Sequence, residues 1–188
     1  MKKYYTQKQY KELLSHLVIV AQTNEQKNEH ILSSFDQKGI RYKQKSISEG
    51  DYAFYIEACP ELGFPIDTYF TDEVFIERKN SLSELATSFY GQKKKRSDGT
   101  MEYDDAFRRE LKRAKCKKHK YLLVEQPNGL DGILKHDYRN NYSEKSFWST
   151  LHRLEIDYDL RVKFISKENM GLEIYTICKM ILDSEILK

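Results

Sequence analysis

Two spacings of apolar residues recur along the chain. Short apolar or alternating runs predict strands, which we expect at 17–21, 40–47, 52–56, 74–79, 120–125 and 160–165. Longer segments with apolar residues every three or four positions predict helices, which we expect at 1–16, 28–38, 81–90, 105–117, 143–156 and 168–187. Strands and helices therefore alternate over most of the sequence, and this alternation predicts an α/β fold.

Two segments carry turn signals or charge in place of an apolar period. Residues 59–65 hold two prolines and a glycine, which predicts a loop. Residues 91–100 hold a run of lysine and arginine followed by Ser-Asp-Gly, which cannot bury much surface. We expect the second segment to be a mobile loop that becomes ordered on DNA.

The segment Val74-Phe75-Ile76-Glu77-Arg78-Lys79 changes abruptly from apolar to charged. Because side chains alternate along a strand, Glu77 and Lys79 should lie on one face and Arg78 on the other. The strand that follows the turn at Gly50 could pair with this segment and bring Asp51 beside Glu77. Two carboxylates can hold Mg²⁺, and a lysine can stabilise the negative charge that develops on a phosphate. These residues are the set that a metal-dependent phosphodiesterase needs.

An acidic residue two positions before a lysine also arises by chance, since 32% of the residues are charged. The context favours the functional interpretation, because the triad of Glu77, Arg78 and Lys79 ends an apolar strand and comes just before a helix start. Ser81 and Glu84 form a predicted capping box, in which each side chain accepts from the other residue's amide. For Arg78 we expect a salt bridge, with Glu84 as the candidate partner.

Four segments in this order resemble the nuclease domain of XPF-type structure-specific endonucleases, in the compact form found in bacteriophages and mobile elements. They are Gly50-Asp51-Tyr52, 76–86, 107–114 and 121–125. The resemblance runs from about Val18 to Ile165. It implies a restriction-endonuclease-like, or PD-(D/E)XK, core with a central mixed β-sheet flanked by helices. It also implies hydrolysis of DNA with Mg²⁺ or Mn²⁺ as the cofactor.

The resemblance assigns roles to individual residues. Asp51 and Glu77 would be the metal ligands, and Lys79 would orient or deprotonate the attacking water or stabilise the developing charge. The family also treats the arginine at Arg78 as functional. Glu25 is either a carboxylate near the metal or a solvated loop residue. Where the family has Asp-x-Arg-Glu, this chain has Gln22-Thr23-Asn24-Glu25, which keeps only the glutamate.

Positive charge is concentrated after this triad, although the formal net charge is only +3. A charged run is usually a solvated face, but this one lies where phosphates would have to arrive. We therefore expect DNA contacts from a group of basic residues, which are Lys93, Lys94, Lys95, Arg96, Arg109 and Arg113.

Composition argues against several other classes of protein. The sequence has no apolar run long enough for a bilayer and no signal-peptide pattern, so we expect a cytoplasmic protein without a membrane partner. The resemblance adds that the protein is encoded by a phage or a mobile element. The three cysteines are odd in number and lack zinc-ligand spacing. No Gly-rich phosphate loop is present, so we expect no nucleotide cofactor.

We expect one nuclease domain over residues 1–188. Its parts are a helical lead-in at 1–16, a catalytic core at 17–126 and a C-terminal αβ extension at 127–188. The apolar face of the last helix is broad, which fits either closure over its own sheet or a dimer interface. The resemblance adds a homodimer as an expectation.

The leading hypothesis is a metal-dependent endonuclease that cleaves branched or flap-type DNA. The first alternative is a non-catalytic DNA-binding relative, in which Gln22 and Asn24 mark a degraded site. The second is a sequence-specific restriction-type endonuclease that acts on duplex DNA, because this fold serves both kinds of enzyme.

Overall fold

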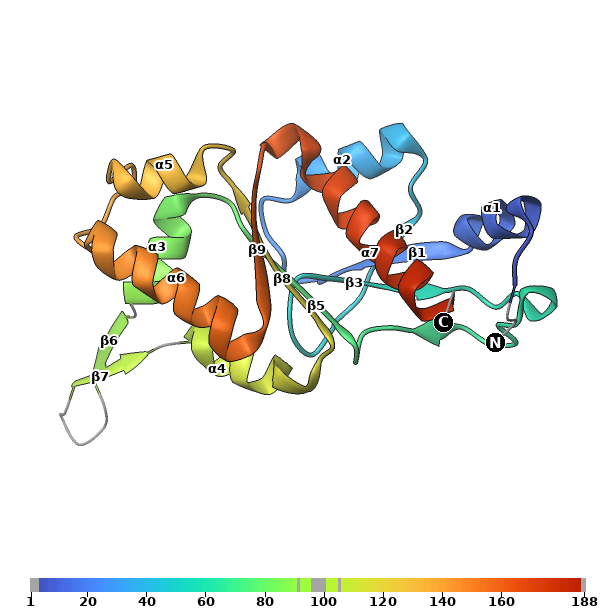
Figure 1. The fold of residues 1–188 in the computed structure, drawn as a ribbon, viewed down its shortest axis with the longest axis horizontal. Helices are drawn as coiled ribbons and strands as arrows, with labels where there is room; N and C mark the ends of the chain where they lie inside the picture. The colour runs from blue at the N-terminus through green and yellow to red at the C-terminus, as the bar shows by residue number, and fades with distance from the viewer. Residues whose placement is uncertain (1–3, 91, 96–100, 105, 187–188) are drawn as a thin grey trace. The chain divides into compact units, whose positions relative to one another are not determined.

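The computed structural model of the protein describes residues 4–90, 92–95, 101–104 and 106–186 (Figure 1). The α-helices are α1 (Gln7–Ser15), α2 (Glu29–Lys38), α3 (Leu82–Tyr90), α4 (Ala106–Arg113), α5 (Gly129–Leu134), α6 (Glu144–Tyr158) and α7 (Met170–Ile186). The strands are β1 (Leu17–Ala21), β2 (Tyr42–Gln44), β3 (Tyr52–Ile56), β4 (Thr68–Tyr69), β5 (Val74–Lys79), β6 (Gln92–Lys95), β7 (Met101–Asp104), β8 (His119–Glu125) and β9 (Leu160–Ile165). Single 3-10 turns lie at Pro60–Leu62, Ala114–Cys116 and Lys167–Asn169.

The main sheet has the strand order β2-β1-β3-β5-β8-β9, and β4 pairs with β3 outside this path. Strand β1 is parallel to β2, and β8 is parallel to β9. Strand β3 is antiparallel to β1, β4 and β5. The sheet is therefore mixed and its strands alternate with helices along the chain, so the predicted α/β class is confirmed.

The chain divides into two compact units. The first consists of 1–76, 117–119 and 167–188, and the second of 77–116 and 120–166. In the first unit, every residue of β1 and β3 is buried, which explains their almost wholly apolar sequences. Helix α7 packs on α2 and contacts β1 and β3 (Figure 1). A Cβ atom on Gly171 would lie 3.0 Å from Oγ of Ser34, so a glycine suits the close approach of α7 to α2.

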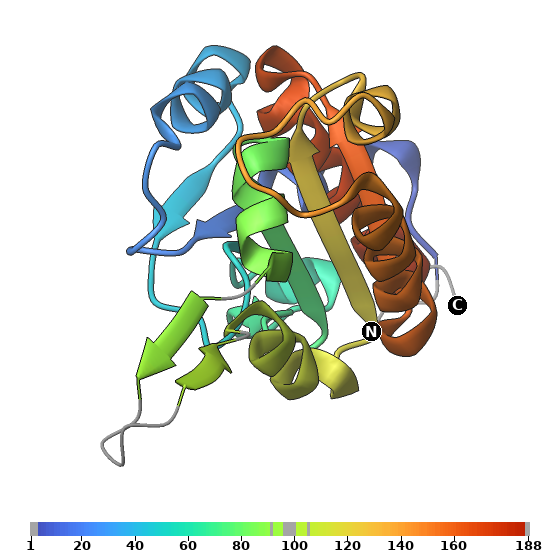
Figure 2. The same cartoon turned by 90° about the vertical axis from the view of Figure 1, so that its left-hand side faces the viewer.

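The second unit contains β8 from Lys120 onward, β9 and the helices α3 to α6. The centre of β8, Leu122-Leu123-Val124, is fully buried, as its sequence predicts for a strand covered on both faces. Helix α6 lies against β9, and α3 contacts α4, α5 and α6 (Figure 2). Phe147, Leu151 and Leu154 form the buried side of α6. None of the described helices is long and apolar enough to cross a bilayer.

Local signals place several helix ends correctly. Helix α2 ends at Gly39, whose φ of 63° is the left-handed conformation that a glycine adopts without steric cost. Helix α6 begins after Ser143, whose hydroxyl accepts from the amide of Ser146. The division into a lead-in, a core and an extension within one domain stays a prediction.

Two expectations about elements are corrected. The strand expected at 40–47 is only Tyr42–Gln44, because β1, with which it pairs, ends at Ala21 opposite Gln44. The expectation of a mobile loop at 91–100 is wrong for the described residues 92–95, because they form β6, which pairs with β7 in antiparallel register. A two-stranded hairpin is held by backbone hydrogen bonds and needs no apolar face, so its sequence carries no apolar period.

Helix α5 also escaped the sequence analysis, because its six residues include two glycines, which disfavour helices. The structure explains one of them. A Cβ atom on Gly129 would lie 1.9 Å from Cδ1 of Phe164 in β9, where the aromatic ring already stands. Packing therefore selects glycine at this position against the helix propensity.

We predict that Gly129→Ala lowers the free energy of unfolding by about 1–3 kcal/mol, because the new methyl group overpacks against Phe164. Gly132→Ala is the matched control on the same helix. There the one close approach of the new methyl group, 2.6 Å, is to the end of the flexible Leu82 side chain, which can move, so stability should stay within about 1 kcal/mol of the wild type. Denaturant unfolding of the two variants measures the difference, and equal effects would contradict this account of α5.

Candidate active site

Strand β5 carries charged side chains into a buried environment. Val74, Phe75 and Ile76 are fully buried, and the burial continues through Glu77 and Arg78, which are only 5% and 4% exposed. A buried charge is costly unless an opposite charge or hydrogen bonds compensate it. The partners of these two side chains therefore determine the geometry of the site.

Glu77 and Lys79 form an ion pair on one face of β5. The Nζ atom of Lys79 lies 2.6 Å from Oε1 of Glu77 and 3.9 Å from Oε1 of Glu84. The same ammonium group lies 5.2 Å from the centre of the Phe107 ring, a cation–π distance. The predicted alternation is confirmed, because the acid and the amine share one face. The amine is held in place by two carboxylates and an aromatic ring.

Arg78 binds Glu125, the last residue of β8. Its Nη1 atom donates to Oε1 of Glu125 at 2.9 Å, and the two side chains are only 3% and 6% exposed. The expected salt bridge of Arg78 is present, but its partner is Glu125 and not the expected Glu84. Glu84 instead contributes to the position of Lys79.

The corner between β5 and α3 is held by a variant of the predicted capping box. The amide of Glu84 donates to Oγ of Ser81 at 3.2 Å, as predicted. The carboxylate of Glu84 accepts from the amide of Asn80 at 2.9 Å, and not, as expected, from the amide of Ser81. Glu84 can reach one residue further back because Asn80 already belongs to the bend between strand and helix.

The turn before β3 fixes the backbone of Asp51 within the first unit. The amide of Asp51 donates to the carbonyl oxygen of Ile76 at 2.8 Å, and Tyr52 is opposite Ile76 in the sheet register. Gly50 has a φ of 85°, and a Cβ atom there would lie 3.1 Å from the same carbonyl oxygen. Glycine is thus required for the turn to approach β5. The backbone of Asp51 is bonded to the residue that precedes Glu77 in the chain.

The turn after β1 contains Gln22 and Glu25. The side-chain amide of Gln22 donates to the carbonyl oxygen of Ile47 at 2.7 Å, and its backbone amide donates to the carbonyl oxygen of Asp51 at 2.8 Å. Gln22 therefore ties two loops together. Glu25 closes the turn through its amide, 3.1 Å from the carbonyl oxygen of Gln22, and its side chain is partly exposed. Its catalytic role stays a prediction.

Lys117 is a buried residue that the sequence analysis did not single out. It is 7% exposed, its ammonium group donates to the carbonyl oxygen of Thr71, and it lies 3.5 Å from Oε2 of Glu49. Glu49 begins the turn that contains Asp51, so the contact of Lys117 with Glu49 stabilises that turn. Nothing in the sequence separates this lysine from the other lysines of the same basic run.

The donor atoms proposed for a metal are carboxylate oxygens, which suit hard cations such as Mg²⁺ and Mn²⁺. Across the described ranges, no group of three or more His, Cys, Asp and Glu side chains could hold a metal ion. Mg²⁺ is commonly bound by one or two carboxylates, with water and substrate phosphate completing the shell. Asp51 and Glu77 fit that requirement in kind and number.

The predicted DNA-contacting residues fall into three groups. Arg109 and Arg113 are exposed and lie one turn apart on α4, so they share a face of that helix. Lys93, Lys94 and Lys95 belong to β6. Arg96 lies outside the described residues. Contact with DNA stays a prediction for all of them.

Comparison with known proteins identifies similar sequences and folds. The model of the ERCC4 domain matches residues 21–178. The structure is similar to XPF from Aeropyrum pernix, with a TM-score of 0.60 and 18% identity over 90% of this chain and 68% of that chain. It is also similar to XPF from Aeropyrum pernix in complex with DNA, with a TM-score of 0.58 and 20% identity over 89% and 66%. The search of curated proteins gave no match.

At this level of identity the two solved structures establish the fold. The predicted restriction-endonuclease-like architecture is confirmed by them together with the mixed sheet and its flanking helices. This chain spans about two thirds of the length of each of those proteins.

We predict that Glu125→Gln lowers the free energy of unfolding by about 3–5 kcal/mol, because it removes a negative charge that is paired with the buried Arg78 guanidinium. The matched control is Glu57→Gln, which removes the partly exposed ion pairs with Arg41 and Lys43 and should cost less than about 1 kcal/mol. Chemical denaturation of both variants provides the measurement. A cost for Glu125→Gln no larger than the control would show that the buried pair does not stabilise β5.

Proposed function

Because the chain belongs to the ERCC4-domain family of XPF-type nuclease domains, a family of DNA nucleases, we propose that it is a metal-dependent endonuclease acting on branched or flap-type DNA. The observation that carries the proposal is the ion pair between Glu77 and Lys79 at the buried end of β5. The backbone bond from Asp51 to Ile76 supports it, because it fixes the second acidic residue beside the same strand.

Asp51 and Glu77 would hold the Mg²⁺ or Mn²⁺ ion. Such an ion polarises a phosphate and lowers the pKa of a bound water. Lys79 carries a positive charge beside Glu77 and would orient the attacking water or stabilise the charge that develops on the phosphate. Glu84 and the Phe107 ring restrict the position of that ammonium group. Glu25 is proposed as a further carboxylate near the metal.

The proposed role of Arg78 is to position its neighbours. Its pairing with Glu125 fixes one face of β5, and alternation then directs Glu77 and Lys79 to the other face. A shift of this strand by one residue would exchange the two faces. The arginine would thus support the chemistry through the register of β5.

Positive charge would guide the phosphate backbone to the site. Arg109 and Arg113 lie exposed on one face of α4, and helix-borne arginines of this kind bind phosphate oxygens independently of base sequence. We propose DNA contacts by these two residues and by the basic segment Lys93, Lys94, Lys95 and Arg96.

One observation favours the alternative of a non-catalytic DNA-binding relative. Gln22 stands at the position of the family's aspartate, and its side chain is engaged by the carbonyl oxygen of Ile47. A structural amide has replaced an acidic group at that point. The activity measurement below separates the two functions.

A homodimer remains part of the proposal. Helix α7 exposes Leu172 and Met180 by 43% and 47%. These apolar side chains would be covered in a dimer, which is the arrangement that the family resemblance implies.

We predict that the protein cleaves flapped or branched DNA in the presence of Mg²⁺ or Mn²⁺, and that EDTA abolishes the cleavage. Asp51→Asn, Glu77→Gln and Lys79→Ala should each lower the single-turnover rate at least roughly 100-fold, because each removes a metal ligand or a charge that stabilises the transition state. Gel analysis of labelled junctions and of linear duplex would report both rate and preference.

The matched controls are Asp131→Asn and Lys145→Ala, which remove the same charges at exposed positions on α5 and α6. They should cleave like the wild type. If the wild type binds DNA but does not cleave with either metal, the non-catalytic alternative is correct. Equal cleavage of linear and branched DNA at one base sequence would favour a restriction-type enzyme.

We further predict that Arg109→Gln and Arg113→Gln weaken DNA binding to a similar extent for every base sequence, because phosphate contacts carry no sequence information. Each change should also reduce the slope of log Kd against log salt concentration by about 0.9 for duplex DNA. Fluorescence anisotropy at several salt concentrations measures this. An unchanged slope would remove these arginines from the DNA interface.

A further inference from the structure

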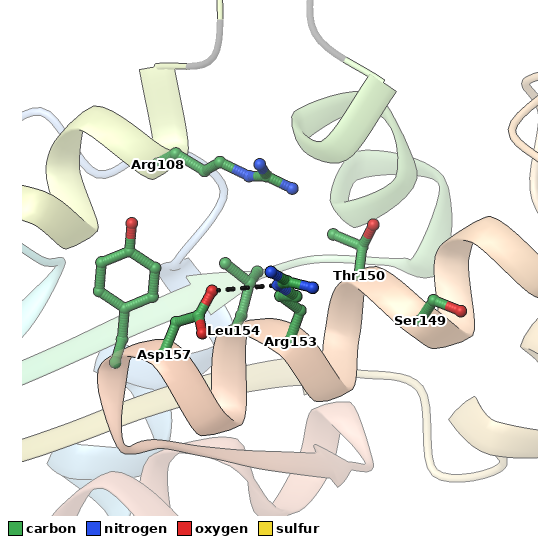
Figure 3. Close-up of a pocket in the computed structure, with 7 residues that line it drawn as sticks. Arg108, Ser149, Thr150, Arg153, Leu154 and Asp157 are labelled. Atoms are coloured by element: carbon green, nitrogen blue, oxygen red, sulfur yellow. Dashed lines mark hydrogen bonds and ion pairs between the residues drawn. The ribbon is translucent and has the colours of Figure 1, made fainter.

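A cavity of about 380 Å³ lies between α4 and α6 in the second unit, separate from the residues of the proposed active site. It is lined by Arg108, Ser149, Thr150, Arg153, Leu154, Asp157 and Tyr158 (Figure 3). Apart from Leu154, these side chains are all polar or charged, and most are groups that donate hydrogen bonds. This composition suits an anionic ligand more than an apolar one.

Two arginines from different helices define the cavity. The guanidinium groups of Arg108, from α4, and Arg153, from α6, both point into the space between the two helices (Figure 3). Asp157, one turn further along α6, accepts from Nε of Arg153 at 3.4 Å. A guanidinium group has five N–H donors, so this contact orients Arg153 and uses only one of them.

Hydroxyl groups stand beside the arginines. Ser149 lies one turn before Arg153 on α6, and the hydroxyl of Thr150 shares a hydrogen bond of 2.5 Å with the hydroxyl of Tyr142. Guanidinium and hydroxyl groups together are the usual partners of phosphate oxygens. With two cations and one carboxylate, the lining has a net charge of +1, which matches the single negative charge of a phosphodiester.

We propose that this Arg108–Arg153 pocket binds a backbone phosphate of the DNA, at a point distinct from the phosphate that is cleaved. The proposal rests on the proposed function only in taking DNA as the ligand. Arg108 contributes from α4, and Arg153 presents its planar fork to two phosphate oxygens. Asp157 positions that fork.

An extended strand fits the pocket better than a small phosphate compound does. The side chain of Arg153 is 75% exposed, so the pocket opens to solvent and does not enclose a ligand. Arg109 follows Arg108 directly, and successive residues of a helix point about 100° apart, so α4 also carries positive charge next to the pocket. A strand could contact both in succession.

The test compares Arg153→Gln, Arg153→Lys and Arg108→Gln with Lys145→Gln, a matched loss of one exposed charge on α6 outside the pocket. DNA affinity is measured by fluorescence anisotropy in EDTA across several salt concentrations, so the result does not depend on cleavage. Each pocket Gln variant should bind roughly tenfold more weakly and lose about 0.9 of the salt slope, while Lys145→Gln binds like the wild type. Arg153→Lys should keep the slope but lose part of the affinity, since lysine lacks the fork.

Three results would overturn the assignment. The first is a set of pocket variants whose affinity and salt slope equal those of Lys145→Gln. The second is a change in sedimentation, without a change in DNA affinity, which would make the pocket a protein contact. The third is a melting-temperature rise with inorganic phosphate that Arg153→Gln abolishes while DNA affinity stays constant. Absence of cleavage by the wild type would disprove the proposed nuclease activity. The DNA affinities of the pocket variants, which are measured in EDTA, would still test the pocket.

Discussion

The ion pair between Arg78 and Glu125 is the constraint on which the geometry of the site depends. Both side chains are almost completely buried, and their charged atoms lie 2.9 Å apart. Removing either partner would break a buried ion pair, which is strongly destabilising, so this pair ties the end of β5 to the end of β8. A strand fixed in this way can present its neighbouring residues only to the opposite face.

That opposite face carries the second ion pair, between Glu77 and Lys79. Its ammonium group is held further by Glu84 and by the Phe107 ring, and Glu84 in turn closes the corner into α3. The catalytic proposal thus depends on one short segment, in which alternation separates the arginine that pairs with Glu125 from the acid and the amine that are proposed to be catalytic. The family to which the chain belongs provides the nuclease context for this arrangement.

The sequence predicted the elements that are buried and periodic. Strands β1, β3, β5 and β8 contain apolar runs that are largely buried, and β9 is an alternating run of which only Leu160 is buried. The shared face of Glu77 and Lys79 follows from alternation alone. The partner of Arg78 could not be predicted, because Glu125 is 47 residues away and only the order of strands in the sheet brings it close.

Other features depend on three-dimensional packing that no local signal reports. Helix α5 contains Gly129 because a ring from β9 occupies the place of its side chain. Lys117 is buried beside Glu49, although it resembles its exposed neighbours in sequence. The Arg108–Arg153 pocket joins residues from two helices. The sequence analysis predicts a DNA contact for the adjacent Arg109 and does not single out Arg108. Tertiary contacts, and not composition, distinguish these residues.

Asp51 and Glu77 are proposed to hold a divalent metal ion, and a measurement of metal binding tests this proposal without requiring catalysis. Electron paramagnetic resonance of Mn²⁺ titrated into the protein measures bound and free ion without requiring substrate or turnover. We expect a saturable Mn²⁺ site in the wild type that is lost in Asp51→Asn and Glu77→Gln, while both variants keep the native circular dichroism spectrum. Equal Mn²⁺ binding by the wild type and the two folded variants would contradict it.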